Sequence, residues 1–173
     1  GAEENAMDVK GLRDALRVRN YVIDRFEEAE HLDDQVPDDL LTFVVVGGGP
    51  TGVEAAADIH DLIFNVLEGD YPNVDFDRVR VVLVNAGDQI LKGLDSSLVN
   101  AATRRLASQR IEVINDAKVE EVGSDAVAIS DGRTIPTQTT VWAAGIEPPP
   151  LVGDLDVQKD HRGRILIDQY LRV

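Results

Sequence analysis

The sequence predicts an α/β fold: a Rossmann-like, three-layer dinucleotide-binding domain with a parallel sheet and a small antiparallel β-meander. Two apolar, β-branched runs at 41–46 and 79–84 are typical of strands buried on both faces of a parallel sheet. A glycine cluster and then a helical pattern follow the first run, which is the order of a βαβ unit. From residue 118 to 137 the hydrophobic period changes to two, which indicates antiparallel strands.

The N-terminal part predicts one helix and a linker. Apolar side chains recur at roughly helical spacing from about Val9 to Glu30, and Asp8 is a candidate N-cap. Residues 31–39 are polar and acidic and contain Pro37, so we expect a linker and a domain boundary there. The chain is therefore divided into a helix and linker (1–36), a nucleotide-binding domain (37–147) and a return segment (148–173).

The remaining elements follow from the same periodicities. We expect a helix at 53–62, a helix at 97–109, a strand at 111–114, the meander at 118–137 and a last strand at 139–144. Asp95 or Ser96 is the candidate N-cap of the second helix, and Asp131-Gly132 is a hairpin turn signal. The prolines at 148–150 should break regular structure, and 164–167 reads as one more strand.

Composition excludes several classes of protein. The 17 Lys and Arg against 32 Asp and Glu give a net charge of −15, with the acids spread along the whole chain. A solvated surface tuned to high salt explains this acidity better than a cationic partner, and binding to nucleic acid is disfavoured. The absence of cysteine excludes disulfides and thiolate metal sites, and the three scattered histidines predict no metal site. We also expect neither a signal peptide nor a membrane-spanning segment.

The motif Gly47-x-Gly49-x-x-Gly52, between a strand and a helix, predicts a dinucleotide site. Gly47 permits the tight turn, Gly49 lets the backbone approach a pyrophosphate, and Gly52 lets the helix pack close to the strand. The unpaired N–H groups of the first helical turn then face the phosphates, with Thr51 as a further donor.

The acid that binds the adenosine ribose in such units should end the second strand, usually about 20 residues after the motif. Here Asn85 ends that strand, at a greater distance that the loop at 69–77 absorbs. Asn85 can hydrogen-bond a ribose, but unlike glutamate it does not repel a 2′-phosphate. No arginine sits immediately after it to bind that phosphate, so NADH is favoured, with NADPH as the alternative.

Four segments resemble type II (single-subunit) NADH dehydrogenases, which are FAD-dependent members of the pyridine nucleotide-disulfide oxidoreductase superfamily. The stretch 44–54 is similar to their NADH-binding loop, and 84–91 continues the likeness. The stretch 140–146, with its tryptophan, is similar to the strand that returns toward the flavin. The helix at 12–20 is similar to the one that leads from the flavin domain into the NADH domain.

This resemblance implies hydride transfer from NADH to FAD and then to a quinone-type acceptor. The cofactors do the chemistry, so no residue of this chain is assigned a catalytic role and no metal is expected. Glu54 resembles the acid near the nicotinamide, although a charge at a helix N-terminus is an equal reading, and Ala144-Gly145 resembles the backbone between nicotinamide and flavin. The expected cofactor contacts are Gly47, Gly48, Gly49, Pro50, Thr51, Gly52, Glu54, Asn85, Ala86, Ala144 and Gly145.

The comparison also implies that the chain is the NADH-binding part of a longer flavoprotein, inactive alone, whose remainder holds FAD. The parent is expected in the cytoplasm, with peripheral attachment to the inner face of the membrane. Two residues depart from the family pattern: Asn85 replaces a glutamate, and Gln109-Arg110 replaces the usual helix-closing glycine. Two alternatives stay open: another FAD-dependent reductase of the superfamily, acting on ferredoxin, rubredoxin or a disulfide, and a non-catalytic nucleotide-sensing module.

Overall fold

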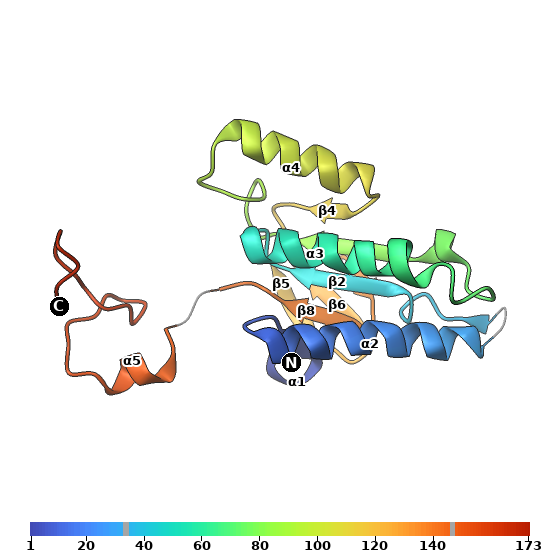
Figure 1. Ribbon diagram of the computed structural model, residues 1–173, viewed down its shortest axis with the longest axis horizontal. Coiled ribbons are helices and arrows are strands. Elements are labelled where there is room, and N and C mark those ends of the chain that lie inside the picture. Colours follow the sequence, from blue (N-terminus) through green and yellow to red (C-terminus); the bar gives the residue numbers. More distant parts are fainter. Residues whose placement is uncertain (33–34, 146–147) are drawn as a thin grey trace.

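The computed structural model describes residues 1–32, 35–145 and 148–173, and its centre is a five-stranded parallel sheet (Figure 1). The strands lie in the order β1-β8-β2-β3-β4. Their bounds are β1 (Ala6–Asp8), β8 (Thr139–Trp142), β2 (Thr42–Val46), β3 (Arg80–Val84) and β4 (Glu112–Ile114). The four strands expected from the sequence are confirmed to within about two residues at each end, and β1 is an addition.

The central strand β2 is buried on both of its faces, as its unbroken apolar run predicts. Every residue of β2 is buried. Phe43 and Val45 belong to one hydrophobic cluster, and Val44 and Val46 belong to another on the opposite face of the sheet. The α/β sheet with two covered faces is therefore the predicted architecture.

Helices cover one face of the parallel sheet. These are α2 (Leu12–Glu30), α3 (Pro50–Leu62) and α4 (Ser96–Ser108), and α3 continues into a π-helical turn, η2 (Ile63–Leu67). Buried side chains of α2 and α3 share their cluster with the sheet, for example Phe26, whose ring stacks on Phe43 at a centroid distance of 6.0 Å. A 3₁₀ turn, η3 (Phe76–Arg78), leads into β3.

The predicted meander covers the opposite face and forms the third layer. Its strands are β5 (Val119–Val122), β6 (Ala126–Ile129) and β7 (Thr134–Pro136), paired antiparallel in that order. Val122, Val127 and Ile129 share a buried cluster with Val44 and Val46 of β2. Both faces of the parallel sheet are thus covered, one by helices and one by the meander. A ligand can therefore bind at the carboxyl ends of the parallel strands.

The N-terminal expectation needs correction. Asp8 is not a helix cap: it ends β1, which pairs in parallel with β8 and so keeps residues 6–8 extended. The helix begins at Leu12 with Gly11 as N-cap, and the Asp14 carboxylate accepts hydrogen bonds from the N–H groups of Lys10 and Gly11. A short helix, α1 (Ala2–Asn5), precedes β1.

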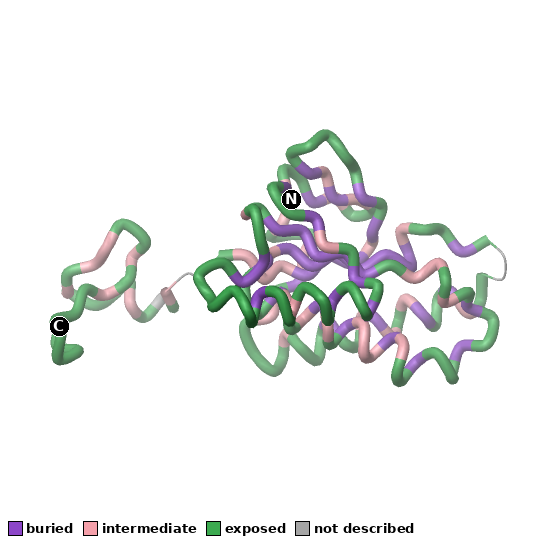
Figure 2. The backbone as a smooth tube through the Cα atoms, turned by 90° about the horizontal axis from the view of Figure 1, so that it is seen from above, coloured by how far each residue is buried: buried purple, intermediate pink, exposed green. Residues whose placement is uncertain are grey.

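The C-terminal expectation also needs correction. No strand forms at 164–167: within the described residues the pairing there is one isolated bridge between Lys159 and Ile165. The prolines do not simply break structure, because Pro149 is the N-cap and Pro150 the first residue of α5 (Pro150–Asp154), where a missing N–H does no harm. Figure 2 shows buried residues gathered in 1–145, whereas 148–149 and 151–173 are drawn as exposed or intermediate. Among the described residues, no helix has the length and hydrophobicity needed to cross a membrane.

Candidate cofactor site

The turn between β2 and α3 is held by close backbone contacts that only glycine permits. Gly47 has a φ of +120° and still donates its N–H to the Val84 carbonyl at 2.8 Å. A Cβ atom on Gly47 would lie 2.8 to 2.9 Å from the backbone of Ala143 and Ala144. A Cβ atom on Gly52 would overlap the carbonyl oxygen of Gly47. These two glycines therefore serve the turn and the helix–strand packing that the motif predicts.

Gly49 is different, because it faces open space. It is the N-cap of α3, with extended backbone, and no heavy atom of the described residues lies within 4 Å of where its Cβ would stand. No contact within this described part of the chain requires a glycine there. An open cradle at a helix N-terminus that a side chain would fill fits the close approach of a pyrophosphate.

The first turn of α3 supplies the donors for an anion. Pro50 occupies the first helical position, and the first helical hydrogen bond runs from the Val53 N–H to the Gly49 carbonyl at 3.0 Å. The N–H groups of Thr51 and Gly52 precede that bond and have no acceptor within the helix. α3 also has no side-chain cap, so the positive end of its dipole is left open.

Asn85 packs directly against this turn. A Cβ atom on the buried Gly48 would collide with the Asn85 side chain, a reason for glycine at 48 that the motif alone does not give. Asn85 is 8% exposed, and its amide donates to the Gly87 carbonyl at 3.0 Å and to Asn115 Oδ1 at 2.8 Å. Its Oδ1 accepts from the Gly87 N–H. The residue that follows β3 is therefore uncharged, and the next residue, Ala86, is exposed.

The charged residues after Asn85 pair with each other. Lys92 Nζ lies 3.0 Å from Asp88 Oδ1, and this bond holds the pKa of the Asp88 carboxyl below its ordinary value. Both side chains are well exposed, so the pair is an ordinary surface ion pair.

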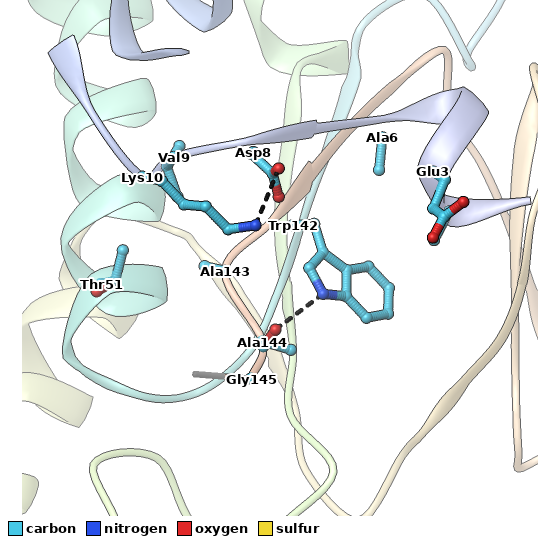
Figure 3. Close-up of a pocket in the computed structure, with 11 residues that line it drawn as sticks. Glu3, Ala6, Asp8, Val9, Lys10, Thr51, Trp142, Ala143, Ala144 and Gly145 are labelled. Carbon is cyan, nitrogen blue, oxygen red and sulfur yellow. Dashed lines mark hydrogen bonds and ion pairs between the residues drawn. The ribbon is translucent and has the colours of Figure 1, made fainter. Parts of the chain in front are cut away.

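A cavity of about 690 Å³ opens at the carboxyl end of β8 (Figure 3). Because β8 and β3 lie on opposite sides of β2, this cavity lies away from Asn85 at the end of β3. Its wall is the segment from Trp142 to Gly145, and Thr51 from the first turn of α3 also lines it. The volume suits a small-molecule or cofactor site. Of the expected contacts, Thr51, Ala144 and Gly145 meet here, beside the glycine turn.

The rest of the cavity comes from the N-terminal segment, which sequence reasoning did not assign to the site. Asp8 and Lys10 line it, 3.3 Å apart between Oδ2 and Nζ, together with Glu3. Lys10 is the one cation among the described lining residues, in a chain with a net charge of −15. No motif marks these residues: they reach the site because β1 pairs with β8, from Ala6 opposite Thr140 to Asp8 opposite Trp142.

Glu54 lies in a neighbouring cavity and not in the one beside Ala144. That cavity, of about 370 Å³, lies between α2 and α3 and has a mainly apolar lining. Val9 and Thr51 line both cavities, so Glu54 is one turn of α3 away from the shared wall. The first turn of α3 thus lies between Glu54 and the Ala144-Gly145 segment, the residues that were predicted to contact the nicotinamide.

The polar side chains that line the larger cavity are few. They are the Asp8–Lys10 ion pair, Glu3 and Thr51, and its described lining includes no histidine, cysteine, serine or tyrosine. His60 lies elsewhere, where its Nδ1 is 3.1 Å from Asp61 Oδ1, and this hydrogen bond holds the pKa of Asp61 below its ordinary value. In the described part of the chain, no group of three His, Asp or Glu side chains could hold a metal ion.

Known sequences match this arrangement over the whole chain. The family profile described as "Pyridine nucleotide-disulphide oxidoreductase" matches residues 1–173. A "Probable NADH dehydrogenase" of Dictyostelium discoideum is 36% identical, across 100% of this chain and 39% of that protein. The "Type II NADH:quinone oxidoreductase Ndh" of Mycobacterium tuberculosis is 34% identical, across 95% of this chain and 37% of its own length. An "External alternative NAD(P)H-ubiquinone oxidoreductase B2, mitochondrial" of Arabidopsis thaliana is 36% identical, across 100% of this chain and 31% of its own.

A solved structure shares the fold. "Structure of NDH2 from plasmodium falciparum in complex with NADH" superposes with a TM-score of 0.81 at 21% identity, covering 96% of this chain and 35% of that one. The chain thus spans between 31 and 39% of the length of these curated relatives.

Proposed function

The chain belongs to the pyridine nucleotide-disulphide oxidoreductase family, and from this premise we propose that it is the NADH-binding domain of a flavin-dependent NADH dehydrogenase. The observation that carries the proposal is the glycine turn: Gly47 and Gly52 are required by packing, whereas Gly49 faces open space at an uncapped helix N-terminus. The relatives named above supply the redox class, since their names state oxidation of NADH or NAD(P)H.

We infer one orientation of the dinucleotide on this site. Its pyrophosphate would lie on Gly49, Pro50 and Thr51, where helix N–H groups and the dipole favour negative charge. The adenosine would extend toward Asn85 and Ala86 at the end of β3. The nicotinamide would enter the larger cavity, against Ala144 and Gly145, with Glu54 behind the first turn of α3.

FAD, held by the remainder of the parent flavoprotein, would supply the hydride acceptor, and a quinone-type compound would be the final electron acceptor. The work of this chain is to bind the nicotinamide, to orient it and to exclude water from it. The wall formed by the half-buried Ala144 and the exposed Gly145 fits the face on which two flat rings would meet, because neither residue has a side chain beyond Cβ.

The structure bears on the choice of nucleotide through Asn85. Its neutral amide is engaged with Gly87 and Asn115, and no arginine immediately follows it in the sequence to bind a 2′-phosphate. We therefore propose NADH as the preferred substrate, with NADPH tolerated because the neutral Asn85 does not repel its phosphate as a glutamate would.

The same proposal assigns the parts of the chain. Residues 1–36 lead in from the flavin domain, 37–147 bind the nucleotide, and 148–173 return toward the flavin. Of this first part, Asp8 and Lys10 nonetheless line the site. The parent would work in the cytoplasm, attached to the inner face of the membrane through parts outside this chain.

Isothermal calorimetry with NADH and NADPH, at low and high salt, tests the proposal. We expect micromolar to millimolar NADH binding that Gly49→Val abolishes. Gly69→Val is the matched control, because Gly69 also faces open space but lies in a distant loop. A folded chain that binds neither nucleotide, or that binds equally well with Gly49→Val, would contradict the proposal. Tighter NADPH than NADH would reverse the assigned preference and leave the site in place.

A further inference from the structure

The single tryptophan of the chain connects the cavity to the end of β8. Trp142 is the last residue of β8, and its indole Nε1–H donates to the carbonyl oxygen of Ala144, two residues further on, at 2.8 Å. Its side chain is half-buried: it packs against the cluster under the meander and also lines the cavity, as Figure 3 shows.

This hydrogen bond begins where the sheet stops. The last backbone bond from this end of β8 to β2 is donated by the Ala143 N–H to the Val46 carbonyl, at 2.9 Å. The indole then fixes the carbonyl of the next residue, Ala144, before the chain turns at Gly145, whose φ is +87°. The path of the cavity wall therefore depends on a side-chain bond.

The same segment touches the phosphate turn. The backbone of Ala143 and Ala144 is the nearest neighbour of Gly47, with 2.8 to 2.9 Å between those atoms and a Cβ placed on Gly47. A shift of Ala144 thus moves one side of the cavity and presses on the start of the glycine turn. A tryptophan that only filled the hydrophobic cluster would need neither the indole donor nor a face in the cavity.

We propose that Trp142 is a positioning residue for the nicotinamide end of the dinucleotide, acting through its hydrogen bond to Ala144. The inference rests on the proposed function and adds to it a residue that the glycine motif does not include. Asp8 lies opposite Trp142 in the register of β1 and β8. Its ion pair with Lys10 therefore lines the same cavity as Trp142 (Figure 3).

The test compares two ligands that differ only at the nicotinamide end. Trp142→Phe keeps an aromatic ring and removes the indole N–H. Calorimetry should show that this variant binds ADP-ribose, which lacks nicotinamide, within twofold of the wild type. NADH should bind about fivefold more weakly, the factor expected for one net hydrogen bond. The fluorescence of the bound nicotinamide should shift toward that of free NADH.

Tyr21→Phe is the matched control, since it also removes an aromatic donor to a backbone carbonyl, that of Gln138 just before β8, at 3.2 Å. It should leave both affinities unchanged. An equal loss for NADH and ADP-ribose, or no loss for either, would overturn the inference. A wild-type chain that binds neither ligand would instead refute the proposed function, so the two failures are distinguishable.

A second measurement covers the case in which Trp142→Phe does not fold. Because Trp142 is the sole tryptophan, its emission in the wild-type chain reports this position alone. Saturation with NADH should quench it with sensitised nicotinamide emission, and saturation with ADP-ribose should not. Bound NADH without energy transfer would place the nicotinamide away from Trp142 and overturn the inference.

Discussion

Two strand-to-helix connections leave the same edge of the parallel sheet. They differ in how the free N–H groups at the start of each helix find a partner. Between β2 and α3 there are three residues, all glycine, and the helix starts without a side-chain cap. Between β3 and α4 the connection runs from 85 to 95, and α4 is capped by the Asp95 carboxylate, which accepts from the Ser97 N–H at 2.8 Å. The first helix N-terminus is thus open to an external anion, and the second is closed by an internal one.

The longer connection also rests on the shorter one. The Leu91 N–H donates to the Gly48 carbonyl at 2.7 Å, and the Asn85 side chain lies against the place where a Cβ of Gly48 would be. The glycine turn therefore packs against the β3–α4 connection and is also a candidate phosphate site. Variants at the individual glycines should separate the effect on packing from the effect on binding.

Gly52→Ala should have the largest effect on stability, because its Cβ overlaps the Gly47 carbonyl oxygen, a backbone atom that has no room to move. We expect a loss of about 3 kcal/mol in the free energy of unfolding, measured by urea denaturation. Gly69→Ala, in open space, is the control. A Gly52→Ala chain with an unchanged midpoint would mean that α3 does not pack so closely on the turn.

Gly49→Asp should separate binding from stability by giving α3 the kind of cap that α4 has. The extended backbone and open surroundings of Gly49 accept an aspartate, so the free energy of unfolding should rise by a few tenths of a kcal/mol. The added carboxylate occupies and repels the pyrophosphate position, so NADH affinity should fall at least about tenfold, or ~1.4 kcal/mol. Calorimetry and urea denaturation on the same sample measure both. Undiminished NADH binding would show that the pyrophosphate does not bind at the N-terminus of α3.

Gly48→Ala should reveal how strongly the two connections are coupled. The new methyl must displace the Asn85 side chain and break its hydrogen bonds to Gly87 and Asn115, which should cost about 2 kcal/mol. Asn85→Ala removes most of the clash, so the double variant should be less destabilised than the sum of the two single variants. Additive free energies in this double-mutant cycle would show that Gly48 and Asn85 act independently.

The difference between the two connections also explains what the sequence could predict. The β2–turn–α3 unit was predicted because its signals are local: a buried run, three glycines at fixed spacing and a helical pattern. The contact of Gly48 with Asn85 depends on how two loops far apart in the chain meet, and no local pattern reports that. The same holds for Asp8 and Lys10, which reach the cavity through the pairing of a three-residue edge strand with β8 at the other end of the chain.

Asp95→Ala tests the closed helix end, with an expected pH dependence. Hydrogen bonds from the Ser97 hydroxyl and N–H hold the pKa of Asp95 below its ordinary value. The cap therefore adds stability above the unfolded-state pKa of about 4 and loses it as the pH falls through the lower folded value. The variant should melt below the wild type at pH 7, and the two curves should converge toward pH 2. A melting difference that persists in acid would assign the effect to something other than the carboxylate.

Arg110→Gly should have the smallest effect on the free energy of unfolding, and the effect should be stabilising. The substitution places glycine at the left-handed residue that ends α4. α4 ends in a Schellman motif, with the Ile111 N–H bonded to the Leu106 carbonyl and the Arg110 N–H to the Ala107 carbonyl. Arg110 holds the left-handed position of this motif with a φ of +55°, a position that glycine occupies in most helices ending this way. Relief of this strain exceeds the extra chain entropy of glycine, so we expect a gain of about 0.5 kcal/mol by urea denaturation. Arg110→Ala removes the exposed ion pair to Asp77 but keeps a Cβ, and it should give no gain. If alanine stabilised as much as glycine, the charge would be the cause, and the left-handed arginine would cost the fold nothing.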